Sequence, residues 1–239
     1  MKFATSAPLV ALLKADVLRR RPGGLTESDG LTEGGAVCVL AARDCPDTQH
    51  TVGRPAPGSE FRVIDEAGRE LAVGESGEIV SRSGAMMSGY HNRPDATAAA
   101  EWRDAAGTCF LRTGDVGRFD GDGFLTLLDR RKDMIISGGF NVYPTDLEAV
   151  LSAHSAVAEA AVIGVPSERW GETPVAIVVL RPEAHVDAEE LRSWANERLG
   201  AAQRLAALSV ASELPHSAIG KVLKRELRAR YAATMPPGR

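Results

Sequence analysis

The sequence contains little cysteine. Its three cysteines, Cys38, Cys45 and Cys109, lie far apart and form no CxxC pair. Disulfide-stabilised small folds and cysteine-based zinc sites need more cysteines at closer spacing, so both classes are excluded. We predict that the three cysteines are structural and that the protein works in a reducing compartment.

Long apolar runs and a positive net charge are also missing. The apolar run Pro8–Leu13 is too short to span a membrane, and the charged residues Lys14 and Asp16 follow it directly. The formal net charge is -4 and the pI is about 5.8, so no overall positive field attracts nucleic acid or anionic lipid. We therefore expect no integral membrane segment, no nucleic-acid partner and a cytoplasmic location.

The composition is that of an ordinary globular protein. With 239 residues, of which 44% are hydrophobic and 25% charged, the chain can form one large or two modest domains. The first sixty residues are hard to interpret as a self-sufficient unit. From Glu60 to Leu128, short β-rich pieces such as Phe61–Ile64 and Glu78–Val80 alternate with turns, which predicts a small β-barrel or sandwich.

A mixed α/β pattern follows the charged cluster that ends at Asp133. Strands are predicted at 160–165 and 175–180, with helices between and after them. Pro144 suits the first turn of a helix, and Asp187 resembles an N-cap with Glu190 three positions later. The spacing of apolar residues in 222–231 predicts a last amphipathic helix. The fold class that we predict is α+β.

The first of three motifs is Arg112-Thr113-Gly114-Asp115. A carboxylate just after a Thr-Gly turn is held rigidly, and its two oxygens can accept hydrogen bonds from two neighbouring hydroxyls, as in a ribose diol. The alternative is an Asp that only closes a β-turn, which is the commoner use of Gly-Asp pairs.

The second motif covers residues 129–144. Dense mixed charge, an apolar strand, a Gly-Gly turn and a Pro at a helix start together indicate a domain junction where a ligand can approach the backbone. A solvated charged loop before a hairpin explains the charges but not the glycine turn.

The third motif covers residues 214–225 and contains Gly220-Lys221. A lysine after glycine at the tip of a loop can carry its ammonium group to charge that develops on a phosphate. Taken alone, such a lysine is more often an ordinary surface residue.

In this order, the three motifs resemble those of the adenylate-forming superfamily, which includes acyl-CoA synthetases, peptide-synthesis adenylation domains and beetle luciferases. The resemblance extends to Gly77-Glu78-Ile79, Gly89-Tyr90 and Gly53-Arg54-Pro55 and covers nearly the whole chain. It implies an AMP-forming acyl-CoA synthetase, or fatty-acid-CoA ligase, that uses ATP, Mg²⁺, CoA and a small carboxylic acid.

The resemblance also implies roles for residues of the nucleotide site. Asp115 would bind the ribose hydroxyls of ATP, and Arg130 would support the ribose or the phosphates. Thr32 would face the α-phosphate and Glu33 would help to hold magnesium. The family has an aromatic residue that stacks on adenine where this chain has Asp29.

Further roles are implied for the last part of the chain. Lys132 occupies the family's hinge position, and Lys221 would be the lysine of adenylate formation. Gly138 and Gly139 would line the pantetheine tunnel, with Asn141 on the same loop.

In domain terms, the resemblance implies three parts. Residues 1–57 would be a remnant of the N-terminal AMP-binding domain, 58–131 a β-rich barrel subdomain, and 132–239 a mobile C-terminal lid domain. The sequence contains no Ser/Thr/Gly-rich phosphate loop ending in lysine, so we expect a fragment that is inactive alone. Two alternatives are a non-catalytic nucleotide- or partner-binding remnant and an adenylation domain of peptide synthesis.

Overall fold

The computed structural model describes residues 1–5, 9, 11–217 and 220–234. Part of the apolar run 8–13 and residues 218–219 of the third motif therefore lie outside the described residues. The chain divides into two compact units, Met1–Arg131 and Lys132–Arg239. No helix in the described part of the chain is long and apolar enough to cross a membrane.

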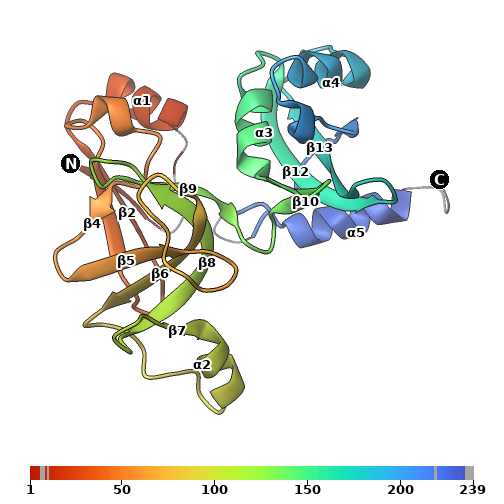
Figure 1. Cartoon of the computed structure of the whole chain (residues 1–239). Helices are drawn as coiled ribbons and strands as arrows, with labels where there is room; N and C mark the ends of the chain where they lie inside the picture. Colours follow the sequence, from red (N-terminus) through yellow and green to blue (C-terminus); the bar gives the residue numbers. More distant parts are fainter. Residues whose placement is uncertain (6–8, 10, 218–219, 235–239) are drawn as a thin grey trace. The chain divides into compact units, whose positions relative to one another are not determined.

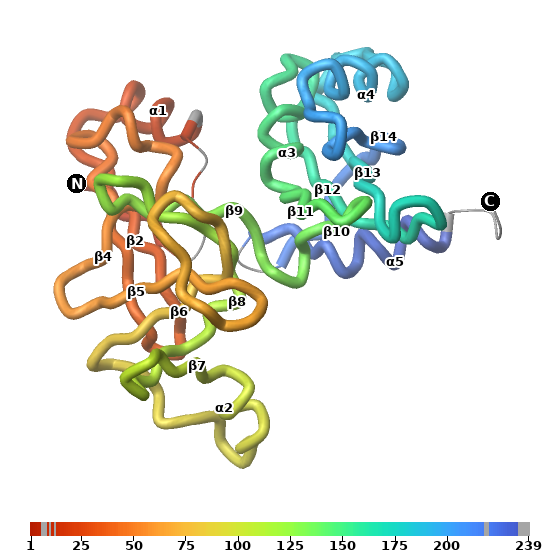
Figure 2. The backbone as a smooth tube through the Cα atoms, viewed as in Figure 1, coloured from red at the N-terminus to blue at the C-terminus, as the bar shows by residue number. Residues whose placement is uncertain are grey.

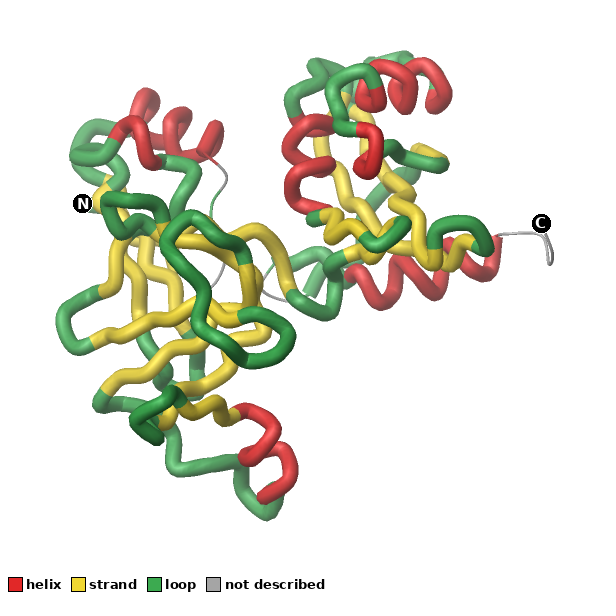
Figure 3. Tube along the Cα trace, viewed as in Figure 1, coloured by secondary structure: helices red, strands yellow, loops and turns green. Residues whose placement is uncertain are grey.

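The first unit contains two sheets, shown as yellow tubes in Figure 3. Its elements are β1 (Lys2–Thr5), α1 (Ala11–Arg20), β2 (Leu25–Gly30), β3 (Val37–Ala41), β4 (Arg54–Pro55), β5 (Ser59–Ile64), β6 (Gly77–Ser83), α2 (Pro94–Ala100), β7 (Glu101–Arg103), β8 (Cys109–Phe119) and β9 (Leu125–Arg130). One sheet has the order β1-β2-β3-β4, and the other β5-β6-β8-β7 with β9 beside β8.

The first sixty residues form more structure than their sequence suggests. Strands β1 and β2 are parallel neighbours, and α1 lies between them in sequence, so the three elements form a βαβ crossover. Strand β3 then pairs antiparallel with β2. Leu25 and Leu40 are buried in one cluster with partly buried Val17 and Leu18 of α1. This packing positions the carboxyl end of β2, where residues 30–33 begin.

The second sheet has the β-rich character predicted for 58–131. The predicted strands at 61–64 and 78–80 are confirmed as parts of β5 and β6. The sheet curls into a half-barrel, as the trace in Figure 2 shows. The prediction of a separate barrel subdomain is not decided by this arrangement and stays a prediction.

In its described residues, the second unit is one mixed sheet with three α-helices. Its elements are β10 (Ile135–Ser137), β11 (Phe140–Val142), α3 (Pro144–Ser152), β12 (Val157–Ser167), β13 (Gly171–Leu180), α4 (Ala188–Asn196), β14 (Ala207–Val210) and α5 (Lys224–Thr234). Pro144 starts α3, and the side chain of Asp187 caps α4 by accepting bonds from two backbone N–H groups, as predicted. The last helix begins at Lys224, two residues later than predicted.

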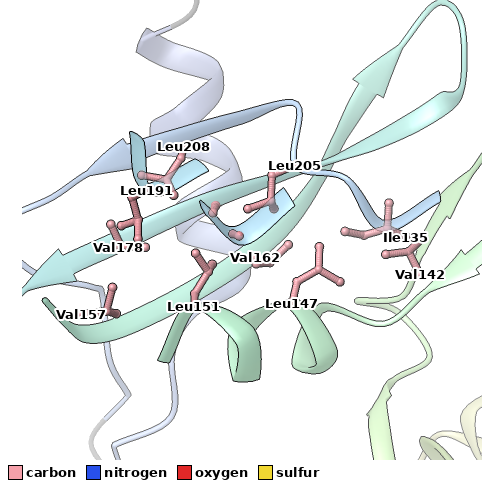
Figure 4. Close-up of a cluster of buried hydrophobic side chains, with 12 residues drawn as sticks. Ile135, Val142, Leu147, Leu151, Val157, Val162, Val178, Leu191, Leu205 and Leu208 are labelled. Carbon is pink, nitrogen blue, oxygen red and sulfur yellow. The ribbon is translucent and has the colours of Figure 1, made fainter. Parts of the chain in front are cut away.

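Alternating side chains of β12 and β13 face two separate cores. Val162 and Val178 pack with Leu147 and Leu151 of α3, whose side chains point toward the sheet in Figure 4. The neighbouring strand residues belong to the second cluster, which includes Leu227 of α5. The sheet therefore carries α3 and α4 on one face and α5 on the other, as Figure 1 shows for this unit.

Candidate functional site

Asp115 lies inside a strand and not after a turn, so the predicted Thr-Gly turn is wrong. The whole motif belongs to β8, where the pairing with β6 is irregular: Val80 pairs with Arg112, but Glu78 pairs with Val116. The extra residues form a β-bulge, and Gly114 supplies the positive φ of 72° that it needs. A bulge changes the direction of the side chains around it. The Asp115 side chain therefore reaches the cavity described below.

Asp115 is paired with Arg130, another of the residues expected to bind the nucleotide. The two are cross-strand partners on β8 and β9, and Arg130 Nε lies 2.7 Å from Asp115 Oδ1. The backbone N–H of Asp115 also donates to Thr113 Oγ1 at 3.0 Å, and the Thr113 hydroxyl donates to the carbonyl of Ile79. These contacts fix the carboxylate while its side chain keeps 17% exposure.

A buried carboxylate supports this corner of the sheet. Glu78 is 8% exposed, and its Oε2 contacts Arg112 Nη1 at 2.5 Å and Arg131 Nη1 at 3.1 Å. One carboxylate between two guanidinium groups ties β6 to β8 and to the residue just after β9. No such role for Glu78, Arg112 or Arg131 could be predicted from the sequence, although each lies within one of the family-like motifs.

The predicted phosphate-side residues lie in the turn that follows β2. Thr32 is exposed, and Glu33 is half-buried and accepts a hydrogen bond of 2.9 Å from the Tyr90 hydroxyl. This bond raises the pKa of Tyr90 above its usual value, with burial as a smaller cause. The backbone is held too, because Met87 N donates to the carbonyl of Glu33 and Ser83 Oγ to that of Gly34.

A small cavity joins the end of β2 to the Asp115 region. It measures about 20 Å³ and is lined by residues of β2, its following turn and the curled sheet: Asp29, Gly30, Leu31, Ala36, Phe61, Ile79, Ser81, Thr113, Asp115, Leu125 and Leu127. The structure thus brings two motifs that are far apart in sequence to the same place.

Among the described residues, no cluster of side chains forms a metal site by itself. The described residues contain no group of three or more His, Cys, Asp or Glu side chains that could hold a metal. Mg²⁺ often binds through one or two carboxylates, several waters and the phosphates of a nucleotide. A single carboxylate such as that of Glu33 is compatible with a site of this type, and its role as a magnesium ligand stays a prediction.

Cys38 has the environment of a structural thiol and not of a reactive one. Burial raises the pKa of the Cys38 thiol to about 12, and the nearby Asp29 carboxylate adds to this shift. A thiol with such a pKa remains protonated near neutral pH and is a poor nucleophile. Cys38 also lies in the buried cluster with Val52 and Leu125, consistent with the structural role that we predicted.

In the second unit, Gly138 and Gly139 form the two-residue turn of the β10–β11 hairpin. Their φ values are 58° and 82°, as a tight hairpin turn requires. A Cβ atom at Gly138 would lie 2.8 Å from the ring of Trp170, so glycine is needed there for space as well. Asn141 is exposed on β11 beside this turn.

Lys132 is the first residue of the second unit and is exposed. The next residue, Asp133, forms an ion pair with Arg228 of α5, with 2.9 Å between Asp133 Oδ1 and Arg228 Nη2. The chain is therefore anchored to the second unit one residue after Lys132. The hinge role itself stays a prediction.

Lys221 lies three residues before the start of α5 and is hydrogen-bonded to Ser217. Ser217 N donates to the carbonyl of Lys221, Lys221 N donates to Ser217 Oγ, and Gly220 has a φ of 78°. The Lys221 side chain is exposed. Three residues later, Lys224 forms an ion pair with Glu148 of α3 at 2.8 Å, so the start of α5 is fixed while the Lys221 side chain is exposed.

The first unit thus presents a carboxylate paired with an arginine on its curled sheet, and the second unit, taken by itself, presents an exposed lysine. Two family models match the chain: "AMP-binding enzyme" over residues 3–91 and "AMP-binding enzyme C-terminal domain" over residues 146–221. Together these ranges cover more than half of the chain. The chain belongs to the AMP-binding enzyme family.

Its relatives include carboxylate-CoA ligases. A 4-coumarate-CoA ligase-like protein of Oryza sativa is 39% identical over 241 residues, which cover 98% of this chain and 43% of that protein. A long-chain-fatty-acid-CoA ligase of Bacillus subtilis is 38% identical over 223 residues, covering 93% of this chain and 39% of the relative. The chain thus spans about two fifths of the length of these relatives.

A solved structure matches in the same way. ATP-bound MatB from Rhodopseudomonas palustris has 32% sequence identity and a TM-score of 0.87, over 96% of this chain and 45% of MatB. At this identity and coverage, the fold of the described residues is that of a part of the solved enzyme.

Proposed function

We propose that this chain supplies the nucleoside-binding and lysine-bearing parts of an ATP-dependent, AMP-forming acyl-CoA synthetase. In the first half-reaction, a carboxylate oxygen attacks the α-phosphorus of ATP, and pyrophosphate leaves. In the second, the CoA thiolate attacks the acyl carbon and AMP leaves. The observation that carries the proposal is the cavity that places Asp115 beside the turn following β2.

In this proposal, Asp115 accepts hydrogen bonds from the two ribose hydroxyls. The Arg130 guanidinium holds Oδ1 from one side, so that the carboxylate has one orientation before the nucleoside arrives. Thr32, exposed in the turn after β2, faces the α-phosphate with its hydroxyl.

Glu33 is the group of this chain that we assign to magnesium. Bound together with ATP, Mg²⁺ would neutralise charge on the phosphates. The contribution of the chain is to orient the carboxylate, which the Tyr90 hydroxyl does through its bond to Oε1.

The second unit serves the two half-reactions with different residues. Lys221 places its ammonium group near the charge that develops during adenylate formation. Gly138 and Gly139, with Asn141 beside them, line the path of the CoA pantetheine in the second step. One unit cannot present both surfaces to the same site at once, so we propose that it turns about Lys132 between the steps.

The names of the relatives indicate the general class of substrate. A small carboxylic acid is proposed, and a fatty acid is the narrower candidate because a long-chain-fatty-acid-CoA ligase is among the relatives. We also propose a cytoplasmic site of action, where ATP and CoA are present. Since the printed sequence contains no phosphate loop, we expect no turnover from this chain by itself.

Calorimetric titration of the chain with AMP, ATP and a nonhydrolysable acyl-adenylate tests the proposal. We expect binding of AMP and of the adenylate, with no pyrophosphate released from ATP and a carboxylic acid. Asp115→Asn should weaken AMP binding about tenfold, because hydrogen bonds to a charged group each contribute about 1.5–3 kcal/mol. A chain that binds none of the three would contradict the nucleoside site.

The same titration separates the two alternatives. A nucleotide-binding remnant that never belonged to a catalytic unit would still bind AMP, but joining it to the preceding part of a relative would give no pyrophosphate release. An adenylation domain of peptide synthesis would release pyrophosphate in that fusion and transfer the acyl group to a carrier protein in preference to CoA.

A further inference from the structure

A buried hydroxyl group lies beside the proposed nucleoside site without a hydrogen-bond partner. Ser81 of β6 is 0% exposed, and its Oγ has no partner among the residues that the structure describes. A buried polar group that lacks a partner costs free energy comparable to a lost hydrogen bond, so such groups are rare in native proteins. The Ser81 hydroxyl therefore calls for a partner outside the polypeptide.

Ser81 lines the same small cavity as Asp115. The cavity of about 20 Å³ has room for one water molecule, which needs roughly 10–15 Å³ and two to four polar partners. The carboxylates of Asp29 and Asp115 are the charged groups in its lining, and the remaining wall is mostly apolar, with Leu31 and Phe61 among its members.

The chemistry of these groups determines what fits between them. Carboxylates only accept hydrogen bonds, whereas a serine hydroxyl donates one and accepts others. One water molecule can accept from Ser81 Oγ and donate to a carboxylate on each side. Gly35 closes the space next to Ser81, since a Cβ atom there would lie 2.6 Å from Ser81 Oγ.

We propose that this cavity holds one ordered water that links Ser81 to Asp115, which makes Ser81 a positioning residue for the diol-binding carboxylate. The proposal rests on the nucleoside role of Asp115 given above. Arg130 holds Asp115 Oδ1 from the solvent side, and the water supports the same carboxylate from the interior. Ser81 acts on the nucleoside only through Asp115 and does not touch it.

A pair of nucleosides tests this role on the full chain. Ser81→Ala should lower the affinity for adenosine about fivefold, which is the effect of losing one hydrogen bond. The affinity for 2',3'-dideoxyadenosine should be unchanged. Asp115→Asn should show the same preference, and adding Ser81→Ala to it should cause no further loss. Ser209→Ala, which changes an exposed strand serine in β14, is the matched control and should alter neither affinity.

The outcomes distinguish the positioning role of Ser81 from the diol-binding role of Asp115. If Ser81→Ala lowers the affinity for both nucleosides equally, Ser81 is merely structural and the inference fails. The same holds if its full effect on affinity is added to that of Asp115→Asn. If Asp115→Asn itself does not discriminate between the nucleosides, the diol role in the proposed function fails.

A crystal structure of the chain tests the water directly, whatever the nucleosides show. We expect one ordered oxygen within hydrogen-bond distance of both Ser81 Oγ and a carboxylate oxygen of Asp115. An empty cavity, or a Ser81 hydroxyl bonded to a protein group, would overturn the proposal.

Discussion

The tetrapeptide Gly-Leu-Thr-Glu occurs twice in succession, at 24–27 and 30–33, and the two copies have different environments. In the first, Glu27 points to the covered face of β2, is 1% exposed and forms an ion pair with Lys14 of α1. In the second, Glu33 lies in a turn, is half-buried and contacts the Tyr90 hydroxyl. The same four residues thus give a structural carboxylate in one place and a candidate ligand in the other.

The difference shows that partners decide the role of a carboxylate. Lys14 is as deeply buried as Glu27, and its ammonium group also donates to the carbonyl of Thr51 at 2.8 Å. In the first copy, Glu27 Oε2 is paired with the Lys14 ammonium group and Oε1 with Leu9 N. The second copy instead lies next to the cavity at Asp115.

The largest effect that we expect separates the two glutamates by stability. Glu27→Gln leaves the buried Lys14 ammonium without its counter-charge, which should lower the free energy of unfolding of the first unit by about 3–5 kcal/mol. Glu33→Gln should change it by less than about 0.5 kcal/mol, because the half-buried glutamine can still accept the bond from Tyr90 and no buried charge loses its partner. Urea unfolding of the two variants measures both, and equal losses would remove the distinction between the copies.

Two lysines of the second unit, Lys221 and Lys224, show the same contrast between a candidate functional residue and a structural one. Joined to the preceding part of a relative, the chain with Lys221→Ala should form adenylate about a hundredfold to a thousandfold more slowly, the usual cost of one charge-stabilising group. Thioester formation from supplied adenylate should be spared. Lys224→Ala, which removes the ion pair to Glu148, is the control and should affect both steps to the same small extent. Equal losses in both steps for Lys221→Ala would refute its role.

The first glycines of the two copies, Gly24 and Gly30, should also differ in how much a substitution by alanine destabilises the first unit. A Cβ atom at Gly30 would lie 2.9 Å from the carbonyl oxygen of Ala36, so Gly30→Ala should destabilise the first unit by about 1–3 kcal/mol. Gly24 has no atom within 4 Å of such a Cβ, and Gly24→Ala should change stability by less than about 1 kcal/mol. Thermal unfolding of both variants gives the comparison, and the reverse order would contradict the described turn.

The smallest effect concerns the titration of Tyr90. Its pKa is raised chiefly by the hydrogen bond to Glu33, because the phenolate would face a carboxylate. Glu33→Gln should therefore lower the pKa of Tyr90 toward the ordinary tyrosine value, and Glu27→Gln should leave it unchanged. NMR titration of the Tyr90 ring at alkaline pH measures this shift. An unchanged pKa in the Glu33 variant would mean that the two side chains do not bond in solution.

Regular elements of the second unit could be predicted from the sequence. The apolar strands at 160–165 and 175–180, Pro144 at a helix start and the Asp187 cap all carry strong local signals, and each is found in the structure. The glycine turn at 138–139 is confirmed for the same reason, since few other residues adopt two positive φ values in succession.

The local geometry of the site could not be predicted, because it depends on long-range pairing. Thr113 and Gly114 have the composition of a turn, yet the ladders to β6 and β9 make them a bulge in a long strand. Likewise, the ion pair of Asp115 with Arg130 exists only in the register of β8 with β9. The role of Glu27 needed Lys14, which lies on another element.

The spacing of the two copies has a consequence for folding. Their offset is an even number of residues, so a slip of β2 by one copy would keep the same side chains on the covered face and bring Glu33 to Lys14. Such a competing alignment would lower the energy gap that protects the native state. What makes it costly is the turn that follows: Gly34, with a φ of 70° and a Cβ position only 1.9 Å from the carbonyl oxygen of Ala85, tolerates no other residue in its place.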